Sequence, residues 1–249
     1  DECRARLSIA NNCEITMEVN PGKIECGSLL GYLEAGVNRL SIGAQSFDRI
    51  MLKALGRIHG PKEVWDTFTD ATKAGFDNIN IDLMFALPGQ SIDQAATDVK
   101  SAVELSPQHI SYYQLTLERN TVFYNSPPVG MPDEDTAWQM QNHGHRLLEI
   151  AGYQQYEISA FARGPNRCRH NVNYWQFGDY LAAGAGAHGK VTAPSGEIIR
   201  YYKPANPQEF IEQAERGCLV DHASQVSRED VGFEFMLNAL RLLDGFPIS

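Results

Sequence analysis

Three polar residues stand where expected β-strands end, and their types suit the binding of a small polar molecule. Glu18, Gln45 and Asp82 each fall toward the C-terminal end of a run in which apolar and polar residues alternate. Ligand sites in parallel α/β sheets and barrels form at the carboxyl ends of the strands. A buried carboxylate needs a partner, so two neighbouring carboxylates call for cations or hydroxyl donors. The three residues therefore predict one shared small-molecule site.

A basic residue follows the second of these strands. Arg57 can offer a charge-assisted fork to the carboxylate of a ligand. Taken alone, it could equally form a surface ion pair. The alternative interpretations of the strand pattern as a whole are an antiparallel sheet with one solvated face and isolated, solvated polar residues.

The alternation has a period of two, which puts apolar side chains on one face of each strand and polar side chains on the other. The apolar sets are Ile15, Met17 and Val19, then Leu40, Ile42 and Ala44, then Ile79, Ile81 and Leu83. The polar sets are Thr16 and Glu18, then Ser41, Gly43 and Gln45, then Asn78, Asn80 and Asp82. Each strand is thus expected to bury one face and to present the other to a ligand.

Helical patterns separate the expected strands, which predicts βαβ units and a parallel sheet. The expected strands are Cys13–Val19, Arg39–Gln45, Asn78–Leu87 and His109–Leu117. The expected helices are Ser28–Ala35, Asp48–Leu55, Pro61–Ala74 and Ser91–Leu105. Four strands cannot close a (β/α)₈ barrel, which needs about 200 residues or more. The chain also begins without Met, so we expect an α/β fold that is a partial (β/α) barrel, with N-terminal units outside this chain.

The pattern changes near residue 125, and we expect two domains, a partial barrel over 1–125 and an α+β region over 126–249. A long helix is expected over Glu134–Ala151. Strand-like segments follow at Tyr156–Ala162 and Ile198–Tyr202, with a Gly/Ala-rich stretch at Ala182–Gly189 and helices at Asn206–Arg216 and Arg228–Leu243.

Composition excludes several classes of protein. The 249 residues carry a formal net charge of −10 and no block of Lys or Arg, which argues against a nucleic-acid partner. No stretch approaches the roughly 20 apolar residues of a transmembrane segment, and no signal peptide is visible. An odd, scattered set of cysteines indicates reduced thiols and a cytoplasmic protein. They are Cys3, Cys13, Cys26, Cys168 and Cys218, none at C-x-x-C spacing, so this chain is expected to hold no metal cluster of its own.

Four segments together resemble the radical S-adenosylmethionine (SAM) superfamily, and most of all its oxygen-independent coproporphyrinogen III oxidase group. The segments are Glu14–Gly22, Gly36–Phe47, Leu55–His59 and Asn80–Gln90, and their order and spacing are specific. The resemblance implies that Glu18, Gln45, Arg57 and Asp82 bind SAM and that Thr116 lines the same pocket. SAM brings a carboxylate for Arg57, and an amino group and ribose hydroxyls for the others.

One departure from that family is serious. Its members carry a C-x-x-x-C-x-x-C motif, whose thiolates hold a [4Fe–4S] cluster, followed by a Gly-rich SAM-binding segment. Neither motif occurs in this sequence. We expect both upstream of Asp1, so the chain as given should neither assemble the cluster nor cleave SAM.

The second half narrows the resemblance to the bacterial heme chaperones of this group. His170 to Trp175 read H-N-V-N-Y-W and match their H-N-x-x-Y-W motif. The imidazole of His170 can ligate heme iron, and Tyr174 and Trp175 offer flat surfaces to a porphyrin. His188 is a second candidate, and Cys168 could supply a thiolate. The commoner role of a histidine beside aromatic rings is structural.

Three functions follow in order of preference. The first is a heme chaperone that binds heme and transfers it to acceptors such as respiratory cytochromes, with SAM and a [4Fe–4S] cluster in the full-length protein. The second is a coproporphyrinogen III oxidase, in which a radical from SAM starts oxidative decarboxylation in porphyrin biosynthesis. The third is an unrelated barrel enzyme that acts on a small polar substrate. Enzymatic activity is therefore left open.

Overall fold

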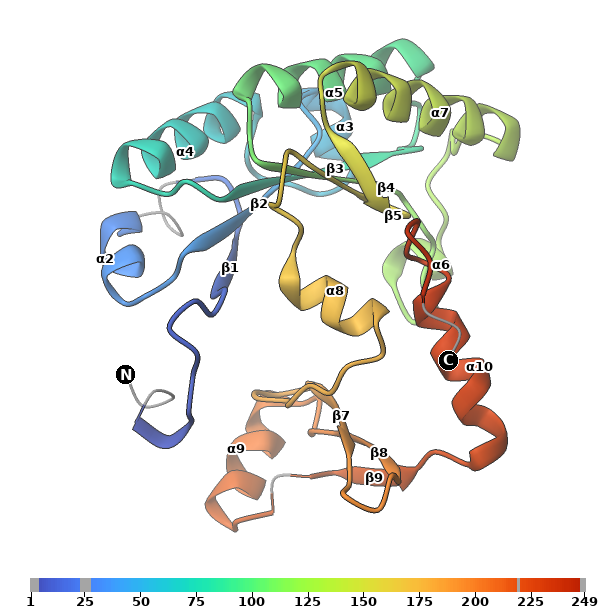
Figure 1. The fold of residues 1–249 in the computed structure, drawn as a ribbon. Coiled ribbons are helices and arrows are strands. Elements are labelled where there is room, and N and C mark those ends of the chain that lie inside the picture. The colour runs from blue at the N-terminus through green and yellow to red at the C-terminus, as the bar shows by residue number, and fades with distance from the viewer. Residues whose placement is uncertain (1–4, 23–27, 219, 247–249) are drawn as a thin grey trace. The chain divides into compact units, whose positions relative to one another are not determined.

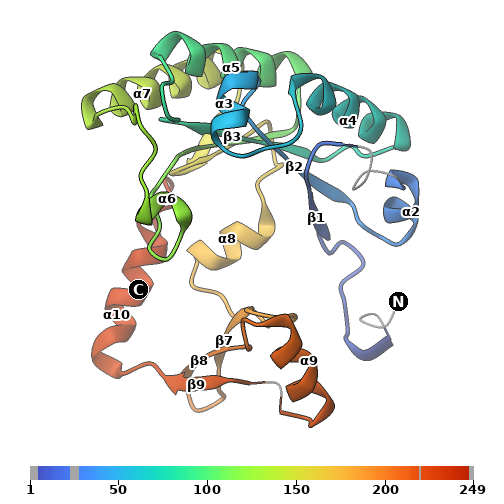
Figure 2. The ribbon, with the colours of Figure 1, turned by 180° about the vertical axis from the view of Figure 1, so that it is seen from behind.

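The computed structural model describes residues 5–22, 28–218 and 220–246, which form two compact units. The first unit is Asp1–Arg167 and the second is Cys168–Ser249. A six-stranded sheet belongs to the first unit and a three-stranded sheet to the second. Figures 1 and 2 show both from opposite sides.

The first unit alternates strands and helices around a mostly parallel sheet. Its strands are β1 (Thr16–Val19), β2 (Arg39–Gln45), β3 (Ile79–Phe85), β4 (His109–Gln114), β5 (Gln154–Glu157) and β6 (Ala160–Ala162). Its helices are α2 (Leu29–Glu34), α3 (Arg49–Ala54), α4 (Pro61–Ala74), α5 (Ile92–Leu105), α6 (Val122–Asn125) and α7 (Glu134–Ile150). The order across the sheet is β1-β2-β3-β4-β6-β5, with β1 to β4 parallel and β5 and β6 antiparallel. The predicted α/β class with a parallel sheet is confirmed.

The main core lies between one face of this sheet and the helices α4, α5 and α7, which cover that face in both views (Figures 1 and 2). The strand residues predicted to be apolar and inward-facing on β2 and β3 are all buried, at 0 or 1% exposure. Burial of such side chains contributes about 1.5–3 kcal/mol each. The opposite face carries the polar side chains of the same strands.

Local signals account for the helix bounds. Pro61 occupies the first turn of α4, and Gly75 ends it in the left-handed conformation with φ 106°. A side-chain cap starts α5, where Ser91 accepts a hydrogen bond from the Gln94 amide at 3.2 Å. Both arrangements satisfy backbone groups that helix ends leave unpaired.

Helix α7 approaches β4 closely at one glycine. The ring of Tyr112 lies where a Cβ at Gly144 would stand, and its hydroxyl donates to the Met140 carbonyl at 3.2 Å. Tyr112 also packs against Phe85, with ring centroids 4.6 Å apart. The absence of a side chain at Gly144 therefore allows the helix to lie on the sheet.

Gly144→Ala is expected to lower the free energy of unfolding by about 1–3 kcal/mol, because the added methyl group meets the Tyr112 ring. Gly232→Ala is the control, since Gly232 lies in a helix with open space around its Cα. That change should stabilise the protein by about 0.5–1 kcal/mol through helix propensity. Thermal unfolding of both variants distinguishes the two effects, and a neutral Gly144→Ala would contradict the packing described here.

The boundary between the two units lies after Arg167, whereas the sequence pattern predicts a boundary near residue 125. Helix α7 packs against α5, and β6 pairs with β4, so the segment after residue 125 completes the first sheet. The predicted strand Tyr156–Ala162 is in fact part of an antiparallel hairpin formed by β5 and β6. Pairing between distant segments decided this boundary, and local composition does not reveal it.

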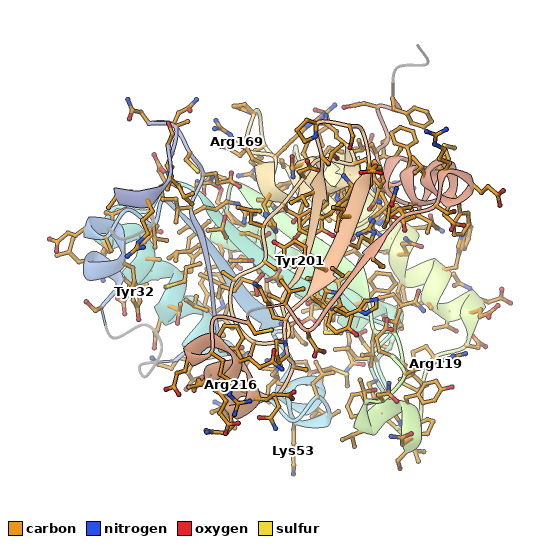
Figure 3. All side chains as sticks on the ribbon, turned by 90° about the horizontal axis from the view of Figure 1, so that it is seen from below. Tyr32, Lys53, Arg119, Arg169, Tyr201 and Arg216 are labelled. Carbon is orange, nitrogen blue, oxygen red and sulfur yellow. The ribbon has the colours of Figure 1, made fainter. Side chains whose placement is uncertain are left out.

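The second unit has its own antiparallel sheet, in the order β7-β8-β9. Its elements are α8 (Arg169–Trp175), β7 (His188–Thr192), β8 (Ile198–Tyr202), α9 (Pro207–Glu215), β9 (His222–Gln225) and α10 (Arg228–Ala239). Lys190 is 2% exposed and pairs with Asp179 at 2.9 Å. On the other side of β7, the ring of Tyr201, labelled in Figure 3, covers Gly189.

Across residues 5–22, 28–218 and 220–246, the structure contains no helix that is both long and apolar enough to span a membrane.

Candidate functional site

The strand register brings the polar side chains together on one face of the first sheet. Glu18 pairs with Ser41, and Ser41 pairs with Asn80. Two residues after Asn80 on β3, and therefore on the same face, Asp82 pairs with Ser111. Residues in register on parallel strands point to the same side, so these side chains share a face.

Asp82 is oriented by donors on its own strand and on β2. Its Oδ2 accepts a hydrogen bond from the Ser41 hydroxyl at 2.9 Å, and its Oδ1 accepts from the Asn80 amide at 2.8 Å. The same Asn80 amide donates to the Ser41 hydroxyl oxygen at 2.7 Å. The carboxylate is half-buried and held by neutral donors, so it can still take a cationic or hydroxyl partner from a ligand.

A buried chain of hydrogen bonds extends this network to the edge of the sheet. The Asn80 carbonyl oxygen accepts from Ser111 at 3.1 Å and lies 2.6 Å from His109 Nδ1. Because that oxygen can only accept, Nδ1 carries the proton, and Nε2 accepts from the Tyr156 hydroxyl at 2.8 Å. Burial and then the charge of Arg39 lower the pKa of His109 to about 3, so the ring is neutral.

The neutral His109 predicts a pH dependence. The unfolded chain takes up a proton at this residue near pH 6.5, and the folded chain does so only near pH 3. Between these values the unfolded state binds more protons, so His109 lowers stability as the pH falls, by about 1.4 kcal/mol per pH unit. Urea unfolding at pH 7 and at pH 5 measures how far the free energy of unfolding falls between these pH values. This decrease should be smaller for His109→Gln than for the parent. Equal losses would contradict a neutral buried ring.

Gln45 lies at an irregularity of the sheet. The register shifts between Ile42 and Gln45, and Gln45 adopts the left-handed conformation with φ 65°. Its Oε1 accepts a hydrogen bond from the Tyr113 hydroxyl at 2.8 Å. A Cβ at Gly43 would stand 3.1 Å from Gln45 Nε2, so glycine leaves room for this side chain.

Tyr113 forms a hydrogen bond with one of the predicted ligand-binding residues and is affected by the charges of three others. Burial raises the pKa of Tyr113 to about 12, and the negative charges of Asp82 and Glu18 act in the same direction. The hydrogen bond to Gln45 and the positive charge of Arg57 act against them. The phenol therefore contacts Gln45 directly, and Asp82, Glu18 and Arg57 influence its pKa through their charges.

Arg57 and Glu18 are the exposed members of this group. Arg57 donates to the side-chain oxygen of Asn20 at 3.1 Å. Within the described ranges it forms no ion pair with a carboxylate, so the alternative of a surface ion pair is not what the structure contains. Its guanidinium therefore keeps donors for an anionic group.

Thr116 lies beyond the end of β4, which stops at Gln114 and not at Leu117. Its side chain is exposed, and its hydroxyl donates to Glu118 at 3.0 Å. The partner of the Thr116 hydroxyl is thus Glu118, which is not one of the predicted ligand-binding residues. Its role in the pocket stays a prediction.

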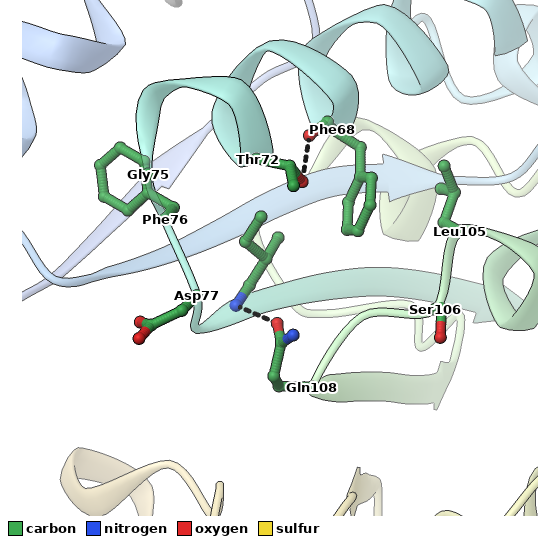
Figure 4. A pocket seen from close by; sticks show the side chains of 9 residues that line it. Phe68, Thr72, Gly75, Phe76, Asp77, Leu105, Ser106 and Gln108 are labelled. Atoms are coloured by element: carbon green, nitrogen blue, oxygen red, sulfur yellow. Dashed lines mark hydrogen bonds between the residues drawn. The ribbon is translucent and has the colours of Figure 1, made fainter.

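A pocket of about 440 Å³ lies elsewhere in the first unit (Figure 4). Its lining includes Asp77 and Gln108, which precede β3 and β4, with Gln108 accepting from the Ile79 amide at 3.0 Å. It therefore lies at the amino ends of these strands, away from Asp82 and Gln45. In α/β barrels this end serves stability and not catalysis.

In the second unit, His170 and Tyr174 lie on one side of α8. Their ring centroids are 4.5 Å apart, and Tyr174 packs against Tyr180 at 4.3 Å. His170 is exposed, so its imidazole is accessible to a metal centre. Trp175 has a different neighbour, since the guanidinium of Arg241 lies over its ring, 4.2 Å from the ring centroid.

His188 belongs to another aromatic group. Its ring lies 5.5 Å from Tyr202, which in turn stacks on His222 at 5.4 Å, across three neighbouring strands. His188 is exposed and contacts Tyr202 instead of the rings of α8. The two histidine candidates thus occupy separate aromatic groups.

Comparison with known proteins shows which family the first part of the chain is similar to. Residues 1–102 match the model of the Radical SAM superfamily. The chain is thus similar to radical SAM proteins over this segment. It is 49% identical over 247 residues to the heme chaperone HemW of Escherichia coli (strain K12), covering 99% of this chain and 64% of that protein. The HemW of Haemophilus influenzae is 46% identical over 246 residues, covering 99% of this chain and 63% of the relative. The chain thus spans less than two thirds of these relatives' length.

A solved structure supports the fold. Coproporphyrinogen III oxidase (HemN) from Escherichia coli, described as a radical SAM enzyme, matches with a TM-score of 0.79 and 21% identity. The match covers 96% of this chain and 57% of that one. The predicted radical SAM fold is therefore confirmed, and the structural likeness to HemN concerns the fold alone.

The side chains of this site suit SAM better than they suit a [4Fe–4S] cluster. Two carboxylates, an amide and a guanidinium suit the amino, hydroxyl and carboxylate groups of SAM. By contrast, no group of three or more His, Cys, Asp or Glu residues in the described part of the chain could hold a metal ion. Among the described residues, Cys13, Cys168 and Cys218 are not joined in disulfides, and Cys3 and Cys26 lie outside the described residues.

Proposed function

We propose that this chain is part of a radical-SAM-type heme chaperone, which binds heme and passes it to acceptor proteins in the cytoplasm. The observation that carries the proposal is 49% identity to the Escherichia coli heme chaperone HemW over 99% of the chain. Respiratory cytochromes are the class of acceptor proposed. Enzymatic turnover is not part of this proposal.

The first unit would bind SAM at the carboxyl ends of β1, β2 and β3. Arg57 would pair with the SAM carboxylate, because its guanidinium is exposed and has no carboxylate partner among the described residues. Glu18, Gln45 and Asp82 would receive the amino group and the ribose hydroxyls, and Thr116 would line the pocket. When bound together, SAM and a [4Fe–4S] cluster supply radical chemistry. The cluster ligands are proposed to come from residues outside this chain.

The second unit would bind heme through His170. Its exposed imidazole is a suitable ligand for iron, and the neighbouring Tyr174 offers an aromatic surface to the porphyrin. Arg241 lies over one face of the Trp175 ring. Trp175 would therefore contact heme through the edge of its ring or through the opposite face. His188 is the second candidate, with Tyr202 beside it.

The alternative function is an oxygen-independent coproporphyrinogen III oxidase. The structural match to HemN favours it at the level of the fold, with a TM-score of 0.79. The H-N-V-N-Y-W segment over His170 to Trp175 favours the chaperone.

Two assays on the full-length protein separate the functions. Hemin titration followed by the Soret band tests heme binding, and subsequent mixing with an apo-cytochrome tests transfer. Absence of a hemin-dependent band would contradict the chaperone proposal. Anaerobic incubation with coproporphyrinogen, SAM and a reductant tests the alternative, which decarboxylated product would support.

A further inference from the structure

A buried carboxylate lies behind the site, on the helix side of the sheet. Asp98 of α5 is 1% exposed. Its Oδ1 accepts from the Phe47 amide at 2.6 Å, and its Oδ2 accepts from the Ser46 hydroxyl at 2.7 Å and the Gln90 amide group at 3.3 Å. All three donors are neutral, so no cation offsets the burial. Burial accordingly raises the pKa of Asp98 to about 6.

Two of these donors directly follow Gln45. The left-handed conformation of Gln45 is unfavourable for a residue with a side chain, by about 1–2 kcal/mol, and persists only where the surroundings hold it. The Ser46 amide donates to the Ala44 carbonyl at 2.8 Å, and Asp98 fixes the side chain of Ser46 and the amide of Phe47. Asp98 therefore holds the turn that aims Gln45.

The same turn continues to Arg57 through a short chain of contacts. The Asp48 amide donates to the Ser46 hydroxyl oxygen at 3.0 Å, and Asp48 caps α3 by accepting from the Ile50 amide at 2.7 Å. At the far end of α3, the Arg57 amide donates to the Leu52 carbonyl at 2.9 Å. Gln45 and Arg57 thus flank one short segment whose start is fixed by Asp98.

The third donor connects Asp98 to the strand that carries Asp82. Gln90 lies in the loop after β3, where its Oε1 accepts from the Leu87 amide at 3.2 Å. One carboxylate therefore ties the loop after β2 to the loop after β3. These are the two loops that continue from the strands bearing Gln45 and Asp82.

We propose that Asp98 is a positioning residue that sets the affinity of the strand-end site for SAM by fixing the segment between Gln45 and Arg57. This inference rests on the proposed SAM site. Asp98 does not reach the ligand itself. It acts through Ser46 and Phe47 on one side and through Gln90 on the other.

Asparagine cannot replace this carboxylate. Both oxygens of Asp98 accept hydrogen bonds, whereas an asparagine has one acceptor and one donor group. In Asp98→Asn the amide group must therefore face either the Phe47 amide or the pair formed by Ser46 and Gln90. A buried donor left without an acceptor costs about 1–3 kcal/mol, so the turn should shift.

The test is calorimetric titration of SAM into the reconstituted full-length protein. Asp98→Asn should raise the Kd about tenfold. Asp93→Asn, an exposed residue of the same helix, should leave the Kd unchanged. Val99→Ala is the control for simple loss of stability, because Val99 is fully buried in the apolar core on α5 and its side chain has no polar atom that could hydrogen-bond the turn. It should lower Tm comparably without changing the Kd.

Ser46→Ala is a milder variant that removes one donor, and it should raise the Kd about threefold to fivefold. An unchanged Kd in both Asp98→Asn and Ser46→Ala would overturn the inference while leaving the SAM site intact. A Kd that rises equally in Val99→Ala would also overturn it. If the parent does not bind SAM, the proposed SAM site itself fails, and with it this role of Asp98.

Discussion

Arg57→Gln is expected to weaken SAM binding by the full-length protein about thirtyfold. The guanidinium is exposed and forms no ion pair within the described residues, so a ligand carboxylate would be its charged partner. A charge-assisted hydrogen bond contributes about 1.5–3 kcal/mol, and about 2 kcal/mol corresponds to this change in Kd. Titration calorimetry with the reconstituted protein measures it.

Arg49→Gln is the matched control for that experiment. Arg49 is also an exposed arginine, at the start of α3, where it neighbours Glu63. Its loss should leave the SAM affinity within about twofold, since surface ion pairs contribute about 0–1 kcal/mol to stability. Similar losses in both variants would show that general charge, and not the position of Arg57, governs binding.

His170→Ala is expected to raise the Kd for hemin at least about tenfold and to shift or abolish the Soret band of the bound state. The reason is the loss of an exposed imidazole that would ligate the iron. Because His170 is exposed and its ring contacts Tyr174 on the same helix, the fold should survive the change. Absorbance titration with hemin measures both effects.

Two further variants serve as a control and as a test of the second candidate ligand. His143→Ala removes an exposed histidine of α7 and should leave hemin binding unchanged. His188→Ala tests the second candidate, which lies beside Tyr202. An unchanged spectrum in His170→Ala together with a lost band in His188→Ala would move the iron ligand to β7.

The strand faces were predictable from the sequence because they depend on local alternation. Ile42 and Ile81 are buried at 0% exposure, as the period of two requires, and Asp82 lies on the opposite face. Ser41 and Asn80 also followed from this period, yet their role as partners of Asp82 did not. That role depends on the register between β2 and β3, which one strand alone does not encode.

The position of Gln45 was beyond local inference for a related reason. The register shift after Ile42 and the left-handed backbone at Gln45 turn its side chain toward Tyr113. A bulge of this kind arises from packing between strands and loops. Tyr113 could have been suspected, because it shares a strand face with Ser111, but nothing in the sequence indicates its hydrogen bond to Gln45.

Residues from three neighbouring strands and one loop are proposed to form a single SAM site. A crystal structure of the full-length protein with SAM bound tests it most directly. We predict the SAM carboxylate at Arg57, and its amino and ribose groups among Glu18, Gln45 and Asp82. SAM bound away from these residues, for example at the amino ends of the strands beside Asp77 and Gln108, would contradict the claim.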